Sequence, residues 1–339
     1  MKKSDKILDQ EIGAMGAEPS LGRLQRPESY GQKSGLSEAE REDARAFMSR
    51  ARQAVEDRVS NIEDGWIPVL RQDMGIREKF YPAGWEFYVR PATVQAIKNW
   101  TAIDEERPDQ VNRVFNEIIK SCVRIKTGNS MAPWGSLNSW DRFWFILKVR
   151  EYTFAKGETK IEFQDECSEC GTDLTFNLGS DSLFYEFPDE ELIDKYWDGS
   201  QWNISPREYG VLHDDIVLYT PQLSKDEAII EWATAQAHAK QKLDEVFLRF
   251  LPWMLQKAPK DPNVLDKLIQ RCRAEYKSWD ADMFDFMDEV VRNITINPSE
   301  KLKMTCPHCG SEAVSSVQFP NGVKSLFKIH TDRKRFGSR

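Results

Sequence analysis

Two close pairs of cysteines are the residues whose type and spacing could do chemistry. Each pair has two residues between its cysteines and a glycine directly after the second, in Cys167-Ser-Glu-Cys170-Gly171 and Cys306-Pro-His-Cys309-Gly310. This spacing lets a tight turn aim both sulfurs at one ion, and the glycine can take the left-handed conformation that such a knuckle often requires. Two knuckles together predict one tetrahedral four-thiolate site for one Zn²⁺ per chain.

The predicted role of the metal is structural, because a zinc ion with four thiolates has no open position for water. The two pairs are separated by 135 residues. Loop-closure entropy grows only logarithmically, so the intervening segment could fold as an insertion. Two redox pairs or plain thiols are the competing interpretation, but a shared following glycine favours zinc. His308 is expected to point outward, as a reserve ligand.

No catalytic constellation is found in the sequence, and we expect no enzyme. Cys122 follows the apolar face of a predicted helix and is expected to be a core thiol, as is Cys272. The segment His213-Asp214-Asp215 is a weak candidate that more often forms a solvated loop, and the acidic run at 189–191 is better explained by exposed surface. Nucleophile-elbow, phosphate-loop and dinucleotide motifs are absent from the sequence.

The amino-acid composition and charge of the chain disfavour several classes of protein. The chain has 339 residues, of which 40% are hydrophobic and 30% charged, as is typical of a soluble globular protein. No apolar run is long enough to predict a membrane span, and charged residues follow the basic start of the chain where a signal peptide would be apolar. The formal net charge of -8 disfavours extensive nucleic-acid binding.

The predicted elements give an α+β fold class: mixed small β-elements, a four-cysteine zinc ribbon made from two distant knuckles, and an inserted helical bundle. We expect six parts along the chain: a disordered arm at 1–35, an amphipathic helix at 36–63, an α+β domain with the first zinc knuckle at 64–223, a helical insert at 224–295, the second zinc knuckle closing the ribbon at 296–323, and a basic tail at 324–339.

Local signals place elements in the α+β part. The run 79–89 reads as a turn feeding a strand, and helices are expected around 94–100, from Pro108, and from Ser139, as its cap, to Arg150. Alternation at 159–163 and 172–178 predicts a hairpin with the first cysteine pair at its tip, and residues 180–222 are expected to be irregular with short strands near 202–204 and 216–219.

The predicted insert begins with a capping box at Ser224. Its first helix is expected to continue to about Leu255 with a break near Pro252, and two further helices are expected at 263–278 and 281–294. A strand is expected at 313–319, after the second cysteine pair.

The order of these features resembles a known family. Four features follow one another: a strand ending in Phe87-Tyr88-Val89-Arg90-Pro91, a helix from Val111 to Cys122, the segment from Trp140-Asp141-Arg142-Phe143 to Arg150-Glu151-Tyr152-Thr153, and the two knuckles around a helical insert. In this order the chain resembles the baseplate hub assembly proteins of T-even-like contractile-tailed phages. The resemblance spans about 79 to 320.

This resemblance implies a non-enzymatic phage tail baseplate hub assembly factor, or chaperone, or a hub component. It implies protein–protein contacts with hub proteins and the tape-measure protein, and residence in the host cell cytoplasm during assembly. Whether the protein stays in the finished virion tail baseplate is left open, as is its oligomeric state. The metal role carries over to Cys167, Cys170, Cys306 and Cys309 alone. The alternative is a zinc-ribbon nucleic-acid-binding protein that uses the basic C-terminal tail.

Overall fold

A computed structural model describes residues 65–102, 104, 107–154, 159–299, 301–317 and 326–327, with the backbone alone at 108–109. All described residues belong to one compact unit, Asn61–Arg339. The predicted arm at 1–35, the helix at 36–63 and most of the basic tail lie outside the described residues. Within the described part, no helix combines the length and the apolarity that crossing a membrane requires.

A four-stranded antiparallel sheet opens the described chain, and its strands follow one another in the order β1-β2-β3-β4. They are β1 (Ile67–Val69), β2 (Trp85–Val89), β3 (Val123–Thr127) and β4 (Ser130–Ala132), with the 3-10 segment η2 (Arg71–Phe80) after β1. The strand predicted within 79–89 is β2. Strands β1 and β4 have only three residues each, too few for a clear pattern. The sequence prediction also missed β3, although it has five residues and alternates between apolar and polar side chains.

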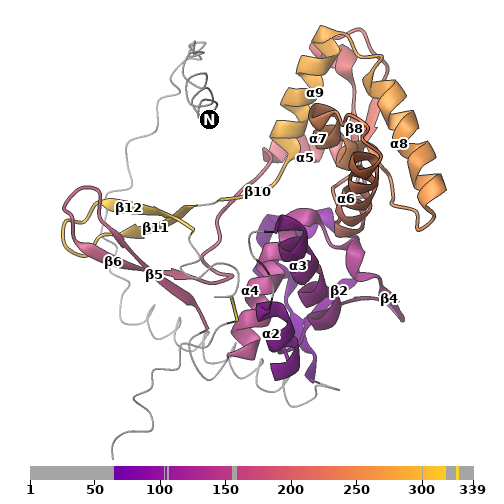
Figure 1. Ribbon diagram of the computed structural model, residues 1–339. Helices are drawn as coiled ribbons and strands as arrows, with labels where there is room; N and C mark the ends of the chain where they lie inside the picture. The colour runs from indigo at the N-terminus through magenta and orange to yellow at the C-terminus, as the bar shows by residue number, and fades with distance from the viewer. Residues whose placement is uncertain are drawn as a thin grey trace, which may run out of the picture. The chain divides into compact units, whose positions relative to one another are not determined.

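Helices α2 (Val94–Thr101), α3 (Pro108–Cys122) and α4 (Arg142–Thr153) accompany this sheet, as Figure 1 shows beside β2. Thr93 caps α2 by accepting a hydrogen bond from the backbone N–H of Ala96 at 3.2 Å, and α3 begins with proline, as predicted. The apolar side of α3 packs inward, and in α4 six of the twelve residues are buried and the rest are half-buried. Together with the sheet they form the first hydrophobic core.

The expected helix cap at Ser139 is wrong. Ser139 opens a 3-10 turn, η4 (Ser139–Asp141), after another short turn, η3 (Trp134–Ser136), and α4 begins only at Arg142. The backbone N–H of Ser139 donates to the carbonyl of Pro221 at 3.0 Å, which ties this turn to a distant segment. A long-range backbone contact of this kind cannot be read from local helix signals.

Two hairpins follow the sheet and close the described chain. The first pairs β5 (Ile161–Glu166) with β6 (Asp173–Leu178), and the second pairs β11 (Lys301–Thr305) with β12 (Glu312–Ser316). Alternate side chains of β6 are buried, as the sequence pattern predicts. Both hairpins contribute to the first core, which also includes Leu326 and Phe327.

The chain between the two hairpins begins with short strands and helices, where the sequence predicted a largely irregular segment. It contains β7 (Tyr185–Glu186), α5 (Glu190–Tyr196), β8 (Trp202–Ile204), the 3-10 turn η5 (Pro206–Tyr209) and β9 (Ile216–Leu218). Strands β8 and β9 pair where short strands are expected. The helix α5 was missed: Asp189 caps it by accepting from the backbone N–H of Glu191 at 3.1 Å, so the acidic run at 189–191 is a helix start.

Four helices complete this region: α6 (Leu223–His238), α7 (Glu245–Met254), α8 (Pro262–Tyr276) and α9 (Ala281–Ile294), and β10 (Asn297–Pro298) returns to pair with β7. The bounds of α9 agree with the prediction, and α8 starts one residue and ends two residues before the predicted bounds. The second core joins α5, β8 and β9 to α7 and α9, and the third lies among α6, α7 and α8.

Two expectations for α6 and α7 are wrong. The capping box does not start α6, because fully buried Leu223 is already helical and its N–H donates to the carbonyl of Leu137 at 2.9 Å. The helix break lies at 239–244, where Lys240 has a φ of 55°, and Asp244 caps α7 at the N–H of Phe247. Pro252 lies inside the last turn of α7.

A buried charged network joins η2 to the start of α4. The Arg77 guanidinium is 2.5 Å from Oδ1 of Asp141, and their side chains are 4% and 0% exposed. The Tyr81 hydroxyl donates to Oδ2 of Asp141 at 2.7 Å and accepts from the backbone N–H of Asn138 at 3.0 Å. Burial raises the pKa of Tyr81 well above its usual value, and Asp141 raises it further, so the hydroxyl stays a donor.

Candidate metal centre

The two hairpins bring together the four cysteines that the sequence singles out. Cys167 and Cys170 follow β5, Cys306 and Cys309 follow β11, and all four sulfurs lie within 4.8 Å of one another. In Figure 1 the hairpins lie side by side. They are joined by a hydrogen bond, in which the Ser315 hydroxyl of the second hairpin donates to Oδ2 of Asp165 in the first. Segments far apart in sequence therefore meet at their cysteine-bearing turns.

The spacing of the sulfurs fits one thiolate-bound ion. Sγ of Cys167 is 3.8 Å from Sγ of Cys309, and Sγ of Cys170 is 3.7 Å from Sγ of Cys306. A regular tetrahedron with metal–sulfur bonds of about 2.3 Å has sulfur–sulfur edges of about 3.8 Å. Disulfide sulfurs would be only about 2.05 Å apart, so these pairs are not disulfide-bonded. The donor set and its spacing form a candidate metal site.

The two cysteine turns have the same backbone construction. In the first, the N–H of Gly171 donates to the carbonyl of Cys167 at 2.8 Å, and in the second the N–H of Gly310 donates to the carbonyl of Cys306 at 2.9 Å. Both glycines have left-handed φ values, 69° and 76°. The left-handed glycine predicted for each knuckle is confirmed, and it explains why glycine follows each pair.

Hydrogen bonds around three sulfurs favour their thiolate forms. The hydroxyl and backbone of Thr172 lower the pKa of Cys170 to about 7, and the corresponding groups of Ser311 lower the pKa of Cys309. The backbone N–H groups of Glu169 and Cys170 lower that of Cys167. Thiolates are the form that binds metal.

The pKa of the fourth cysteine, Cys306, is shifted in the opposite direction. The backbone of Cys309 lowers the pKa of Cys306, but burial and the neighbouring sulfurs of Cys309 and Cys170 raise it to about 11. Several thiolates cannot crowd together without a compensating charge, and a bound divalent cation would supply that charge.

The candidate centre is enclosed on one side and open on the other. Cys167 and Cys306 are buried against the first core, Cys170 is half-buried and Cys309 is exposed. His308 is exposed, but its ring is close enough to make a small contribution to the lowered pKa of Cys170. Among the described residues, the cluster of possible ligand atoms at this place consists of the four sulfurs.

The remaining residues considered from the sequence lie apart from this centre. Burial raises the pKa of both Cys122 and Cys272 to about 11, as expected of core thiols. His213 accompanies exposed Asp214, which pairs with Arg207 at 2.7 Å, and these residues belong to no metal-ligand cluster in the described chain.

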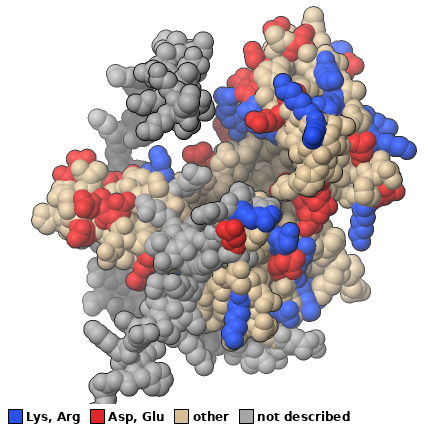
Figure 2. Space-filling model, in the orientation of Figure 1, with Lys and Arg blue, Asp and Glu red and all other residues tan. Residues whose placement is uncertain are grey.

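Acidic side chains surround the cysteine turns. Figure 2 shows them gathered over the hairpin pair, and the exposed ones on the first hairpin include Glu162, Glu166, Glu169 and Asp173. On the second hairpin, Lys303 is paired with Glu312 at 2.9 Å. This surface would repel a phosphate backbone, which disfavours nucleic-acid binding through the hairpins.

Comparison with known proteins gives a family match for part of the chain. Residues 76–205 match the family model described as T4 bacteriophage base plate protein. No curated protein and no solved structure matches the chain. The matched segment runs from η2 to the turn after β8, includes the Arg77–Asp141 network and the first cysteine pair, and ends before the helices α6 to α9. The match supports a phage baseplate protein with a structural role.

Proposed function

We propose that this chain is a non-enzymatic assembly factor or component of a phage tail baseplate hub, and that it works through protein–protein contacts with hub and tape-measure proteins. The observation that carries the proposal is the family match over residues 76–205. The mixed α+β fold built on three buried cores, with a metal-type cluster of thiols, supports a structural role for the chain.

We further propose that Cys167, Cys170, Cys306 and Cys309 hold one structural Zn²⁺. The supporting observations are the sulfur spacing and the matched backbone turns. When bound, the ion would clamp the β5–β6 hairpin to the β11–β12 hairpin, and four thiolates would leave it no position for a reactive water. The clamp would fix both ends of the intervening chain, including α6 to α9, to the first core.

Baseplate incorporation is tested in infected bacteria. A phage that encodes an affinity-tagged copy of this chain is used for infection, and tail intermediates are captured and identified by mass spectrometry. The proposal predicts capture of hub and tape-measure proteins with the tagged chain. Capture of neither, with the tagged phage fully infectious, would contradict the proposed role.

The zinc clamp is tested in the same infections by replacing Cys306 with serine. A copy with Cys272→Ser is the matched control, because that thiol lies in the third core. We expect fewer complete baseplates from the Cys306 variant than from the control. Equal yields would contradict a role for the clamp in assembly.

A further inference from the structure

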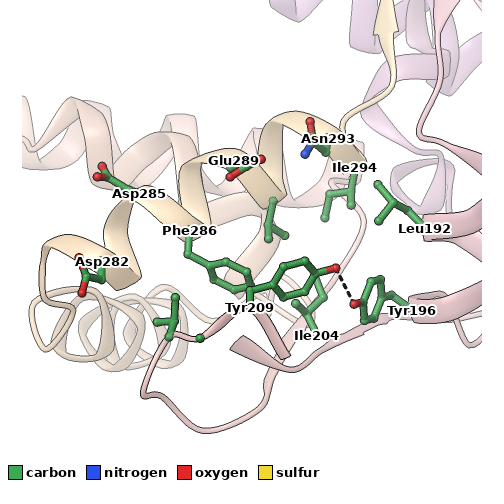
Figure 3. Close-up of a pocket in the computed structure, with 13 residues that line it drawn as sticks. Leu192, Tyr196, Ile204, Tyr209, Asp282, Asp285, Phe286, Glu289, Asn293 and Ile294 are labelled. Atoms are coloured by element: carbon green, nitrogen blue, oxygen red, sulfur yellow. Dashed lines mark hydrogen bonds between the residues drawn. The ribbon is translucent and has the colours of Figure 1, made fainter. Parts of the chain in front are cut away.

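A pocket with apolar walls lies between α9 and the segment that runs from α5 through β8 and η5. Its volume is about 550 Å³. Figure 3 shows Phe286 beside the ring of Tyr209, with Leu192, Ile204 and Ile294 around them. The Tyr196 and Tyr209 hydroxyl oxygens are 2.6 Å apart and form a hydrogen bond at the pocket wall. The pocket therefore offers apolar side chains and ring faces for an inserted apolar group.

One side of the pocket is acidic. Asp282, Asp285 and Glu289 line it from α9 at spacings of three and four residues, which places them on one helix face over about 10 Å. Among the described residues none of the three has an ion pair. By contrast, Asp288 on the same helix pairs with both Arg249 and Arg292. The carboxylates of the pocket side are thus available to an external cation.

A second hollow of about 410 Å³ adjoins the pocket and shares Leu192 and Asn293 with it. Glu186, Asp189 and the half-exposed ring of Phe187 line this second hollow, and its one basic lining residue, Arg292, is already paired with Asp288. These two adjoining hollows, which lie along α9 and at its C-terminal end, are hereafter called the α9 groove. The groove is lined by five carboxylates and one guanidinium.

We propose that the α9 groove docks a basic amphipathic helical segment of a partner protein. Apolar residues of that segment would enter between Phe286, Leu192 and Ile204, and lysine or arginine residues would face Asp282, Asp285 and Glu289. The acidic lining selects a cationic partner and repels nucleic acid. The groove follows a helix of 14 residues, about 21 Å long, which suits a helical segment better than a small ligand.

This inference deepens the proposed function by naming the chemistry of one partner, and it rests on a surface distinct from the cysteines. The probe is a fluorescent peptide of about 14 residues, with leucine at helical spacing on one face and lysine elsewhere. Fluorescence anisotropy measures its binding to the full chain. A second peptide has glutamate in place of each lysine. We expect the lysine peptide to bind and the glutamate peptide not to bind.

Charge reversal on α9 provides the specific test. Asp285→Lys with Glu289→Lys should weaken binding of the lysine peptide at least tenfold. The matched control is Glu231→Lys with Glu275→Lys, which makes the same charge change at exposed positions on α6 and α8 and should weaken binding less than twofold. A photoreactive group on the peptide should crosslink to residues 204–211 and 281–294.

Three results would overturn this inference: no binding of the lysine peptide, equal weakening by both variant pairs, or crosslinks that fall outside the groove. Because the peptide assay uses the isolated protein, its failure would leave the baseplate role intact. Conversely, absence of the chain from tail intermediates would contradict the baseplate role without changing the peptide result.

Discussion

Replacing Asp141 with asparagine should destabilise the protein more than any exposed substitution. The change keeps the shape of the side chain and removes its charge, while the Arg77 guanidinium stays 4% exposed. At present Asp141 accepts hydrogen bonds from both Arg77 and Tyr81. The variant would therefore leave a buried cation without its counter-charge, at a junction between η2 and the start of α4.

The size of this effect follows from the geometry. Two unit charges whose centres are about 4 Å apart, in an effective dielectric constant of about 20, attract by about 4 kcal/mol. Breaking a buried ion pair by removing one partner costs about 3–5 kcal/mol, which agrees with that figure. A loss of this size is a large fraction of the about 5–15 kcal/mol that stabilises a typical protein, and corresponds to a fall in Tm of about 8–16 °C.

Urea unfolding followed by tryptophan fluorescence measures the change in the free energy of unfolding. Asp194→Asn, at an exposed position on α5, is the matched control and should change it by less than about 0.5 kcal/mol. Adding Arg77→Met to Asp141→Asn removes the unpaired cation and should recover at least half of the loss. A cost below about 1 kcal/mol for Asp141→Asn, or no recovery in the double variant, would refute the reasoning.

Two further predictions concern the cysteines and one buried lysine. Cys170→Ser or Cys306→Ser should lower Tm far more than Cys272→Ser, because only the first two remove a ligand of the proposed zinc; equal shifts in differential scanning calorimetry would contradict that distinction. Lys225 is 1% exposed and its ammonium donates to the carbonyls of Thr220 and Pro252, but burial lowers its pKa to about 7. In the unfolded chain Lys225 keeps its proton up to about pH 10.4, whereas in the folded protein it loses the proton above about pH 7. The free energy of unfolding therefore rises with pH, by up to about 1.4 kcal/mol per pH unit above pH 7. Urea unfolding of wild type and Lys225→Met from pH 6 to 9 should show this extra slope in wild type alone, and parallel curves would exclude it.

The parts of the fold that could be predicted from sequence are those fixed by local signals. Pro108 and Pro262 mark the first turns of α3 and α8, and alternating apolar residues mark the β5–β6 hairpin. The cysteine turns were predictable for a similar reason. Each needs two sulfurs and one left-handed residue within five positions, and glycine supplies the latter at Gly171 and Gly310.

Features that depend on distant contacts could not be predicted. The strand β1 has three residues, one of which is Pro68, so its own sequence carries no strand pattern. It is a strand because it pairs with β2. Arg77 and Asp141 are 64 residues apart. The aromatic residues around Asp141 indicate a buried segment, but nothing in the sequence pairs its carboxylate with Arg77. The α9 groove likewise combines α5, β8, η5 and α9, whose acidic residues look in sequence like ordinary exposed helix surface.

The central claim is that four cysteines from two distant hairpins hold one zinc ion. Elemental analysis of the full chain, purified without chelator, tests it most directly. The account predicts one zinc per chain, and loss of that zinc in the Cys306→Ser variant but not in Cys272→Ser. Protein that is folded and carries almost no zinc would contradict it.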